Sequence, residues 1–199
     1  MLWWSTARQL HTVLAGGVAA FLLLLLLFQE STAQLPSFFA SSASVVLILA
    51  APVPLCAALM LCLESRLPSA EDTGVRPIRL LDTGVVLAAL ASALFLSLTV
   101  GMLLDSSPVL EAGRNSVFLV GLMLCVRPLA GSRAVMVPVC WIVVVALMGY
   151  DRFGHAHPWT VLPRPLTDVY ALAITTFTLV AGLALQTYAA RHESGRIAP

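Results

Sequence analysis

The sequence contains no lysine, and all 11 of its basic residues are arginine. A Walker A loop requires a glycine-rich turn that ends in a lysine, because the lysine ammonium group reaches the phosphates of ATP. This sequence has neither that turn nor that lysine. We therefore expect no ATPase activity and no bound cofactor on this chain. ATP and Mg²⁺ would belong to a separate partner chain. An absence of lysine with abundant alanine, leucine and valine is also typical of a GC-rich bacterial genome.

Charge of either sign is scarce. Only 11% of the residues are charged, 59% are hydrophobic, and the mean hydropathy is +0.94. Soluble domains carry about 25% charged and about 45–50% apolar residues. A soluble fold of this length has too little interior to bury so much apolar surface, so the composition predicts helices that are solvated by lipid. A net charge of +1 argues against a nucleic-acid partner, which would require a concentrated basic face.

The motifs of common catalytic and metal centres are also missing. There is no G-x-S-x-G, no H-E-x-x-H and no pair of intramembrane carboxylates, so an intramembrane hydrolase lacks its machinery. His155 and His157 lie near Asp151 and Asp168 in the sequence, but they have no further fixed ligand and we predict no metal site. The cysteines form no C-x-x-C pair, and we interpret them as small buried hydrophobes: Cys56, Cys62, Cys125 and Cys140.

Six apolar runs are present instead. They predict an all-α, polytopic integral membrane protein with six transmembrane helices in a single transmembrane domain over residues 1–199. The predicted spans cover residues 12–28, 38–63, 83–104, 115–131, 134–150 and 167–189.

Three of these runs have unusual features. Arg8 and the sequence Ser31-Thr32-Ala33 around the first run resemble the flanks of a signal peptide, and we interpret the run as a retained span. The second run contains Pro52 and Pro54, which should bend or break the helix near mid-membrane. The fourth run begins near Asn115 and is short, so a re-entrant hairpin is an alternative to a full crossing.

The arginines set the predicted orientation. With the N-terminus inside, eight arginines face the cytoplasm and only Arg114, Arg152 and Arg164 face outward, which satisfies the positive-inside rule. We therefore expect a multi-pass protein of the bacterial cytoplasmic membrane with both termini in the cytoplasm. The eight inner arginines are Arg8, Arg66, Arg76, Arg79, Arg127, Arg133, Arg191 and Arg196.

Two connecting loops are candidates for a mechanism. The cytoplasmic loop 64–82 holds most of the internal charge, and it is either a solvated connector or a docking element for a cytoplasmic protein. The outer loop 151–166 is rich in aromatic residues and proline. It is either an interfacial loop held by Trp159 or a short re-entrant element that covers a pathway between helices.

The stretch Ala112–Leu124 resembles a segment of small actinobacterial ABC transporter permeases. In these proteins an Arg-Asn pair, here Arg114-Asn115, opens span 4 and a G-L-x-L sequence follows. An L-x-G turn, here Leu129-Ala130-Gly131, then leads into span 5. The Trp- and Pro-rich loop before span 6 is similar in character. The likeness covers roughly the C-terminal half.

The resemblance implies the membrane subunit of an ABC-2-like (type V) exporter. Such permeases pair with a second copy or a paralogue, and each binds an ATP-binding ABC subunit. A coupling helix would fall in the 64–82 loop, and short re-entrant helices between spans 5 and 6 would form an extracellular gate. The implied docking residues are Glu64, Arg66, Glu71, Asp72, Arg76 and Arg79. The implied gate residues are Pro158, Trp159, Leu162, Pro163, Arg164 and Pro165.

The chain departs from this family in two respects: it is short, and at most about eleven residues precede span 1. We expect a pathway lined by spans 1, 2 and 5, which carries a hydrophobic or amphiphilic cargo because its walls lack charge. The alternative is a non-transporting accessory or assembly subunit. That alternative predicts no associated ATPase, and it predicts tolerance of changes at Pro158 and Trp159.

Overall fold

The computed structural model describes residues 10–29, 32–35, 43–65, 78–151, 156–157 and 159–196. The composition predicted apolar helices, and within these ranges four helical stretches, against six predicted spans, are long and apolar enough to cross a membrane. They are Leu47–Glu64, Asp82–Leu104, Ser107–Met148 and Val169–Tyr188. A fifth apolar helix, Thr12–Leu27, is shorter. The described helices are thus typical of an integral membrane protein.

The described elements are mostly helices, with one small sheet near the N-terminal helix. A π-helical turn at Leu10–Leu14 leads into the first α-helix, and a small two-stranded antiparallel sheet separates that helix from the next. The elements in chain order are α2 (Ala15–Leu27), β1 (Thr32–Leu35), β2 (Ala43–Val46), η2 (Leu47–Ala50), α3 (Pro52–Glu64), α5 (Ile78–Leu104), α6 (Ser107–Ala130), η3 (Gly131–Val135), α7 (Met136–Met148) and α8 (Val169–Arg196).

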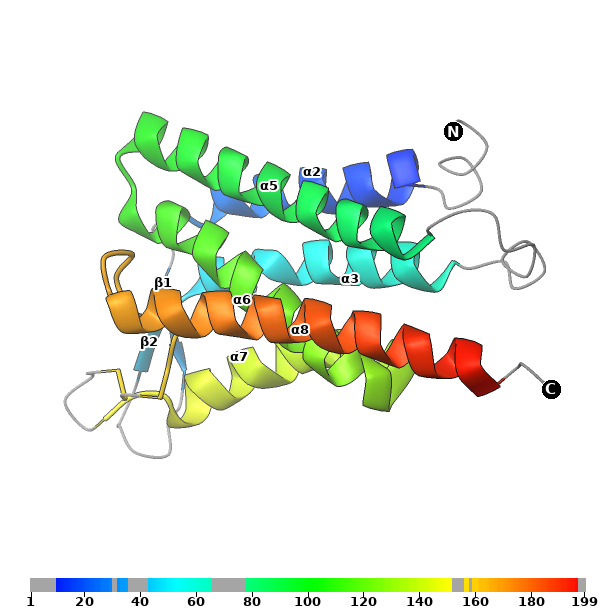
Figure 1. Ribbon diagram of the computed structural model, residues 1–199. Coiled ribbons are helices and arrows are strands. Elements are labelled where there is room, and N and C mark those ends of the chain that lie inside the picture. The colour runs from blue at the N-terminus through cyan, green and yellow to red at the C-terminus, as the bar shows by residue number, and fades with distance from the viewer. Residues whose placement is uncertain are drawn as a thin grey trace.

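The helices run back and forth along one bundle, with α6 at its centre (Figure 1). The start of α2 and the end of α8 lie at the same end of the bundle. The β1–β2 sheet, the α5–α6 turn and the segment that leads into α8 lie at the opposite end. We call this opposite end the loop end.

Close helix contacts occur at glycines. A Cβ atom added at Gly121 of α6 would lie 2.8 Å from the backbone nitrogen of Leu179 in α8, and one added at Gly182 would lie 2.7 Å from the carbonyl oxygen of Gly121. A Cβ atom at Gly17 would likewise overlap Ala58, between α2 and α3. Small residues let apolar helices approach closely where the solvent is lipid, so these glycines set the spacing of the bundle.

The region of the second predicted span differs from expectation. Helix α3 begins at Pro52, and the chain before it forms strand β2 and the short 3₁₀ helix η2. Proline fits the first turn of a helix, because the N–H group that it lacks has no intrahelical partner at that position. Pro52 and Pro54 therefore lie where the helical stretch Leu47–Glu64 changes from the 3₁₀ helix η2 to the α-helix α3.

Helix α6 begins eight residues earlier than the predicted start of span 4. It covers Ser107–Ala130, with Pro108 in its first turn, and ends at Gly131, whose φ of +57° is accessible to glycine. Figure 1 shows α7 running back beside α6 after this turn. Because α6 starts early, Arg114 lies within the helix and not at its start.

Candidate functional site

Arg114 is a buried cation near the loop end of the bundle. It follows the first residue of α6 by seven positions, which corresponds to about 10 Å along the helix. Only 3% of its surface is exposed, and the next two residues, Asn115 and Ser116, are also buried. An ionisable side chain inside an apolar helix bundle is costly and is typical of a functional position. The contacts of Arg114 therefore define the candidate site.

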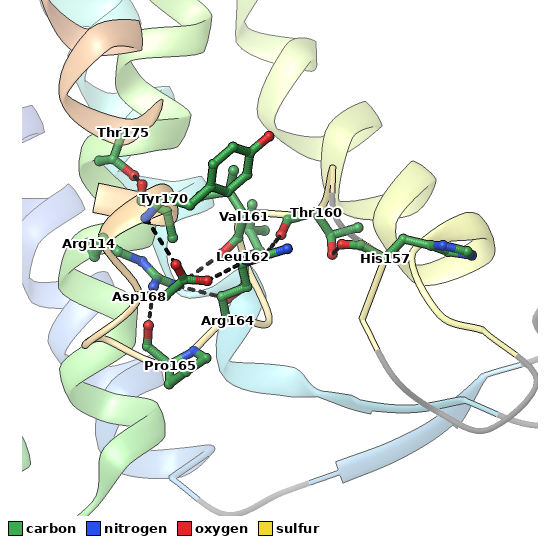
Figure 2. Close-up of polar contacts among 11 residues, drawn as sticks. Arg114, His157, Thr160, Val161, Leu162, Arg164, Pro165, Asp168, Tyr170 and Thr175 are labelled. Atoms are coloured by element: carbon green, nitrogen blue, oxygen red, sulfur yellow. Dashed lines mark hydrogen bonds and ion pairs between the residues drawn. The ribbon is translucent and has the colours of Figure 1, made fainter. Parts of the chain in front are cut away.

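The guanidinium group donates hydrogen bonds to the segment that joins α7 to α8. We call residues 149–168 the α7–α8 loop. Nη1 of Arg114 donates to the carbonyl oxygen of Pro165 at 2.9 Å, and Nη2 donates to those of Val161 at 3.0 Å and Leu162 at 3.1 Å. These bonds, drawn in Figure 2, connect the first third of α6 with three backbone carbonyls of the loop. A cationic donor makes each of them stronger than a neutral hydrogen bond.

Asn115 supports this arrangement. Its Oδ1 atom accepts a hydrogen bond from Nη2 of Arg114 at 3.1 Å, and its Nδ2 atom donates to the carbonyl oxygen of Leu162 at 3.2 Å. The Arg-Asn pair thus binds the loop as one unit. Adjacent residues on a helix point about 100° apart, but the long arginine side chain bends back to its shorter neighbour.

The loop carries its own hydrogen bonds. The Thr160 hydroxyl is fully buried and donates to the carbonyl oxygen of His157 at 2.7 Å. Nε of Arg164 donates to the carbonyl oxygen of Thr160 at 3.0 Å. The backbone N–H of His157 donates to the carbonyl oxygen of Gly149 at 2.9 Å, which joins the loop to the end of α7. These bonds order a segment that has no helix among its described residues.

Asp168 joins the loop to α8. Its Oδ1 atom accepts the backbone N–H of Tyr170 at 2.9 Å, so the carboxylate caps the N-terminus of α8. Its other oxygen accepts a hydrogen bond from Nη1 of Arg164 and forms an ion pair with it (Figure 2). The Arg164 hydrogen bond, with help from the Tyr170 N–H, lowers the pKa of Asp168 below its ordinary value. The guanidinium of Arg164 also lies 5.0 Å from the ring centre of Tyr170.

Aromatic rings connect the loop with α7 and α6. The Trp159 and Trp141 rings meet edge to face with centres 6.2 Å apart, and Trp141 lies 5.8 Å from Phe118. Trp159 is 40% exposed. The Nε1 atom of Trp141 is buried and makes no hydrogen bond within the described part of the chain. The loop is therefore held by polar bonds at Arg114 and by ring packing at Trp141.

The structure joins two sets of residues that the sequence placed in separate sites. Arg114 and Asn115 were expected at the mouth of span 4, and Leu162 and Pro165 in the gate. They lie in direct contact. Leu162 is fully buried, Pro163 and Arg164 are half-buried, and Trp159 is partly exposed. Pro158 lies outside the described residues. The expected re-entrant helices are absent from the described residues of this loop, which form turns.

Most of the proposed docking loop lies outside the described residues. Arg66, Glu71, Asp72 and Arg76 fall in that part, as does most of the 64–82 segment. The ends of the segment are described: Glu64 is the exposed last residue of α3, and Arg79 lies in the first turn of α5. Nη2 of Arg127 donates to the carbonyl oxygen of Leu63 at 3.0 Å, which ties the end of α3 to α6.

The described residues contain no cluster of three or more side chains of the types that bind metals. The sequence matches no protein-family model and no curated protein, and the fold matches no solved structure.

Proposed function

We propose that the chain is the membrane-spanning permease subunit of an ATP-driven ABC exporter of the ABC-2-like type. It would cross the bacterial cytoplasmic membrane six times, with both termini inside, and form the pathway with a second copy or a paralogue. ATP would be hydrolysed on a separate ABC subunit. The observation that carries the proposal is the set of hydrogen bonds from Arg114 and Asn115 to the α7–α8 loop.

Burial of a charge among apolar helices is costly, and here the buried guanidinium donates to the backbone of a loop near the loop end of the bundle. Loss of these hydrogen bonds would release the loop from α6, which is a switch of the order–disorder type. A loop of this kind at the end opposite the termini is suited to open and close an exit from the membrane.

The arrangement of the connections supports the same proposal. The start of α2, the end of α3, the start of α5, η3 and the end of α8 lie at the end of the bundle opposite the α7–α8 loop (Figure 1). In the sequence, six of the eight predicted inner arginines lie in or beside the segments at this end: Arg66, Arg76, Arg79, Arg133, Arg191 and Arg196. The positive-inside rule then puts the 64–82 segment in the cytoplasm, where an ATPase can reach it.

Purification of the tagged chain from its native host, in mild detergent, tests the proposal. We expect a P-loop ATPase to co-purify in stoichiometric amount, and the reconstituted complex to couple ATP hydrolysis to transport. The double variant Arg76→Glu with Arg79→Glu should uncouple hydrolysis from transport without loss of expression. Arg133→Glu makes the same type of charge change in η3 and serves as the control. Unchanged coupling in the double variant would refute the docking role of the 64–82 segment.

The accessory-subunit alternative makes opposite predictions. It expects no co-purified ATPase, and normal assembly when Pro158 and Trp159 are replaced by alanine. The absence of an ATPase from a stable native complex would favour that alternative and overturn the permease proposal.

A further inference from the structure

A groove on the membrane-facing side of the bundle has features of a lipid site. It lies between α5, α6 and α8, with a volume of about 320 Å³. Pockets for small molecules start near this size, at about 300 Å³. Its walls are mostly leucine and valine, and the polar residues that line it are Arg114, Thr175 and Thr176. The groove lies on helices other than those expected to line the transport pathway, so lipid binding there can be tested apart from transport, although both proposals involve Arg114.

The threonines contribute little to recognition of a charged group. The Thr175 hydroxyl donates to the carbonyl oxygen of Ala171 at 2.7 Å, and that of Thr176 to Leu172 at 2.9 Å. Both donors are thus used within α8. Arg114 is the one charged residue that lines the groove. A ligand that fits must therefore place an anion beside Arg114 and an apolar chain beside the leucines.

One N–H group of Arg114 makes no hydrogen bond among the described residues. Nη1 carries two N–H groups, and among the described residues it makes one hydrogen bond, to Pro165. All the described hydrogen-bond acceptors of Arg114 are neutral carbonyl or amide oxygens. The carboxylates of Glu111 and Asp168 attract the Arg114 guanidinium from a distance, but neither makes a described hydrogen bond to it and neither lines the groove. An anionic oxygen would make a stronger hydrogen bond to the guanidinium than a neutral oxygen does.

The apolar part of the groove is open to the surrounding lipid. Leu94 and Leu98 of α5 are 44% and 47% exposed, and Leu172 of α8 is 42% exposed. Counted from the loop end, Leu94 lies ten residues into α5 and Leu98 six, whereas Arg114 and Thr176 each lie seven residues into their own helices. An acyl chain that entered from the bilayer could follow these residues while its headgroup stayed beside Arg114.

We propose that the groove between α5, α6 and α8 binds an anionic membrane lipid, with its phosphate beside Arg114 and one acyl chain along Leu94 and Leu98. The charge of Arg114 favours a headgroup of net negative charge over a zwitterionic one with the same chains. A basic group beside the membrane surface favours an anionic lipid by about fivefold. A lipid bound in the groove would therefore contact Arg114, the same α6 residue that holds the α7–α8 loop.

Native mass spectrometry of the whole protein, released from neutral detergent, tests this site. The probes are dioleoyl phosphatidylglycerol and dioleoyl phosphatidylcholine, which share their acyl chains and differ in net charge. We expect the first to be retained about fivefold more than the second at equal concentration. Equal retention of the two lipids would overturn the proposal.

A matched pair of variants locates the site. Arg114→Gln removes the cation, but it also removes the hydrogen-bond donors that hold the α7–α8 loop. The groove is therefore tested by Leu98→Trp, whose larger side chain fills it. Leu87→Trp is the control, because Leu87 lies on the same helix with the same 47% exposure and does not line the groove. We expect Leu98→Trp to abolish the preference for phosphatidylglycerol and Leu87→Trp to preserve it. The same preference in both variants would show that the lipid binds elsewhere and would refute the site. Neither outcome depends on an ATPase.

Discussion

The side chain of Arg114 and the backbone of Pro165, 51 residues apart in the sequence, meet at 2.9 Å. This hydrogen bond joins the central helix of the bundle to the loop that precedes its last helix. Two more carbonyl oxygens, those of Val161 and Leu162, accept hydrogen bonds from the same guanidinium group. The conformation of the loop is therefore set by a residue outside the loop, and removal of that residue should affect the loop first.

Replacement of Arg114 by glutamine should destabilise the protein. The shorter, neutral amide cannot reach three carbonyl oxygens, and each buried acceptor left without a partner costs about 1–3 kcal/mol. We expect the free energy of unfolding to fall by about 3 kcal/mol. We also expect faster proteolysis within residues 159–168. Thermal unfolding in detergent, with cleavage mapped by mass spectrometry, measures both effects. Arg133→Gln removes an exposed arginine of η3 and should change neither; equal effects of the two substitutions would contradict the assigned role.

Glycine at position 121 should be required for the contact between α6 and α8. A Cβ atom there would lie 2.8 Å from the backbone nitrogen of Leu179, which cannot move without shifting α8. Gly121→Ala should therefore lower the free energy of unfolding by about 1–3 kcal/mol. Gly84→Ala is the control: nothing lies within 4 Å of its added Cβ, and alanine favours a helix by about 0.5–1 kcal/mol over glycine. Thermal melts of both variants measure these effects. An unchanged melting temperature for Gly121→Ala would contradict the close contact between α6 and α8.

The ring of Trp141 should matter more than its N–H group. The ring packs against Phe118 and Trp159, whereas its Nε1 atom is buried without a hydrogen bond among the described residues. Trp141→Phe keeps a ring and removes that donor, so we expect a change in unfolding free energy of less than about 1.5 kcal/mol. Trp141→Ala should cost about 3–5 kcal/mol. Similar losses in the two variants, measured by chemical unfolding, would show that the N–H group has a partner.

Hydropathy was sufficient to predict a helical membrane protein, since long uncharged runs leave few other folds. The start of α6 was missed because residues 107–114 contain Glu111 and Arg114, which lower the hydropathy of a segment that is nevertheless helical. The signal that remained in the sequence was Ser106-Ser107-Pro108, since proline in a first turn marks a helix start. The same rule, applied to Pro52, would have placed the start of α3.

The candidate site was only partly predictable. The resemblance to permeases drew attention to Arg114 and Asn115, and composition to the proline-rich loop, but nothing in a linear sequence indicates that one guanidinium binds three carbonyls 47 to 51 residues away. Backbone carbonyls carry no residue signature, so such contacts cannot be read from residue types. The cap formed by Asp168 was readable, since an aspartate immediately before an apolar run is a typical helix start. The small β1–β2 sheet had no clear alternating pattern and was not expected.

Acid should weaken the connection between Arg164 and Asp168. The Arg164 hydrogen bond holds the pKa of Asp168 below its ordinary value, which is about 3.9 in an unfolded chain. Because the folded pKa is the lower one, the stabilisation by the carboxylate is complete above the unfolded value and is lost as the pH falls through the folded value. The difference in melting temperature between the wild type and Asp168→Asn should thus be constant near neutral pH and shrink below about pH 4. Arg164→Gln removes the main cause of the shift, so in that variant the difference should be smaller and its loss should be complete at a higher pH. A difference between wild type and Asp168→Asn that persists unchanged to pH 2 would show that ionisation of this carboxylate does not stabilise the start of α8.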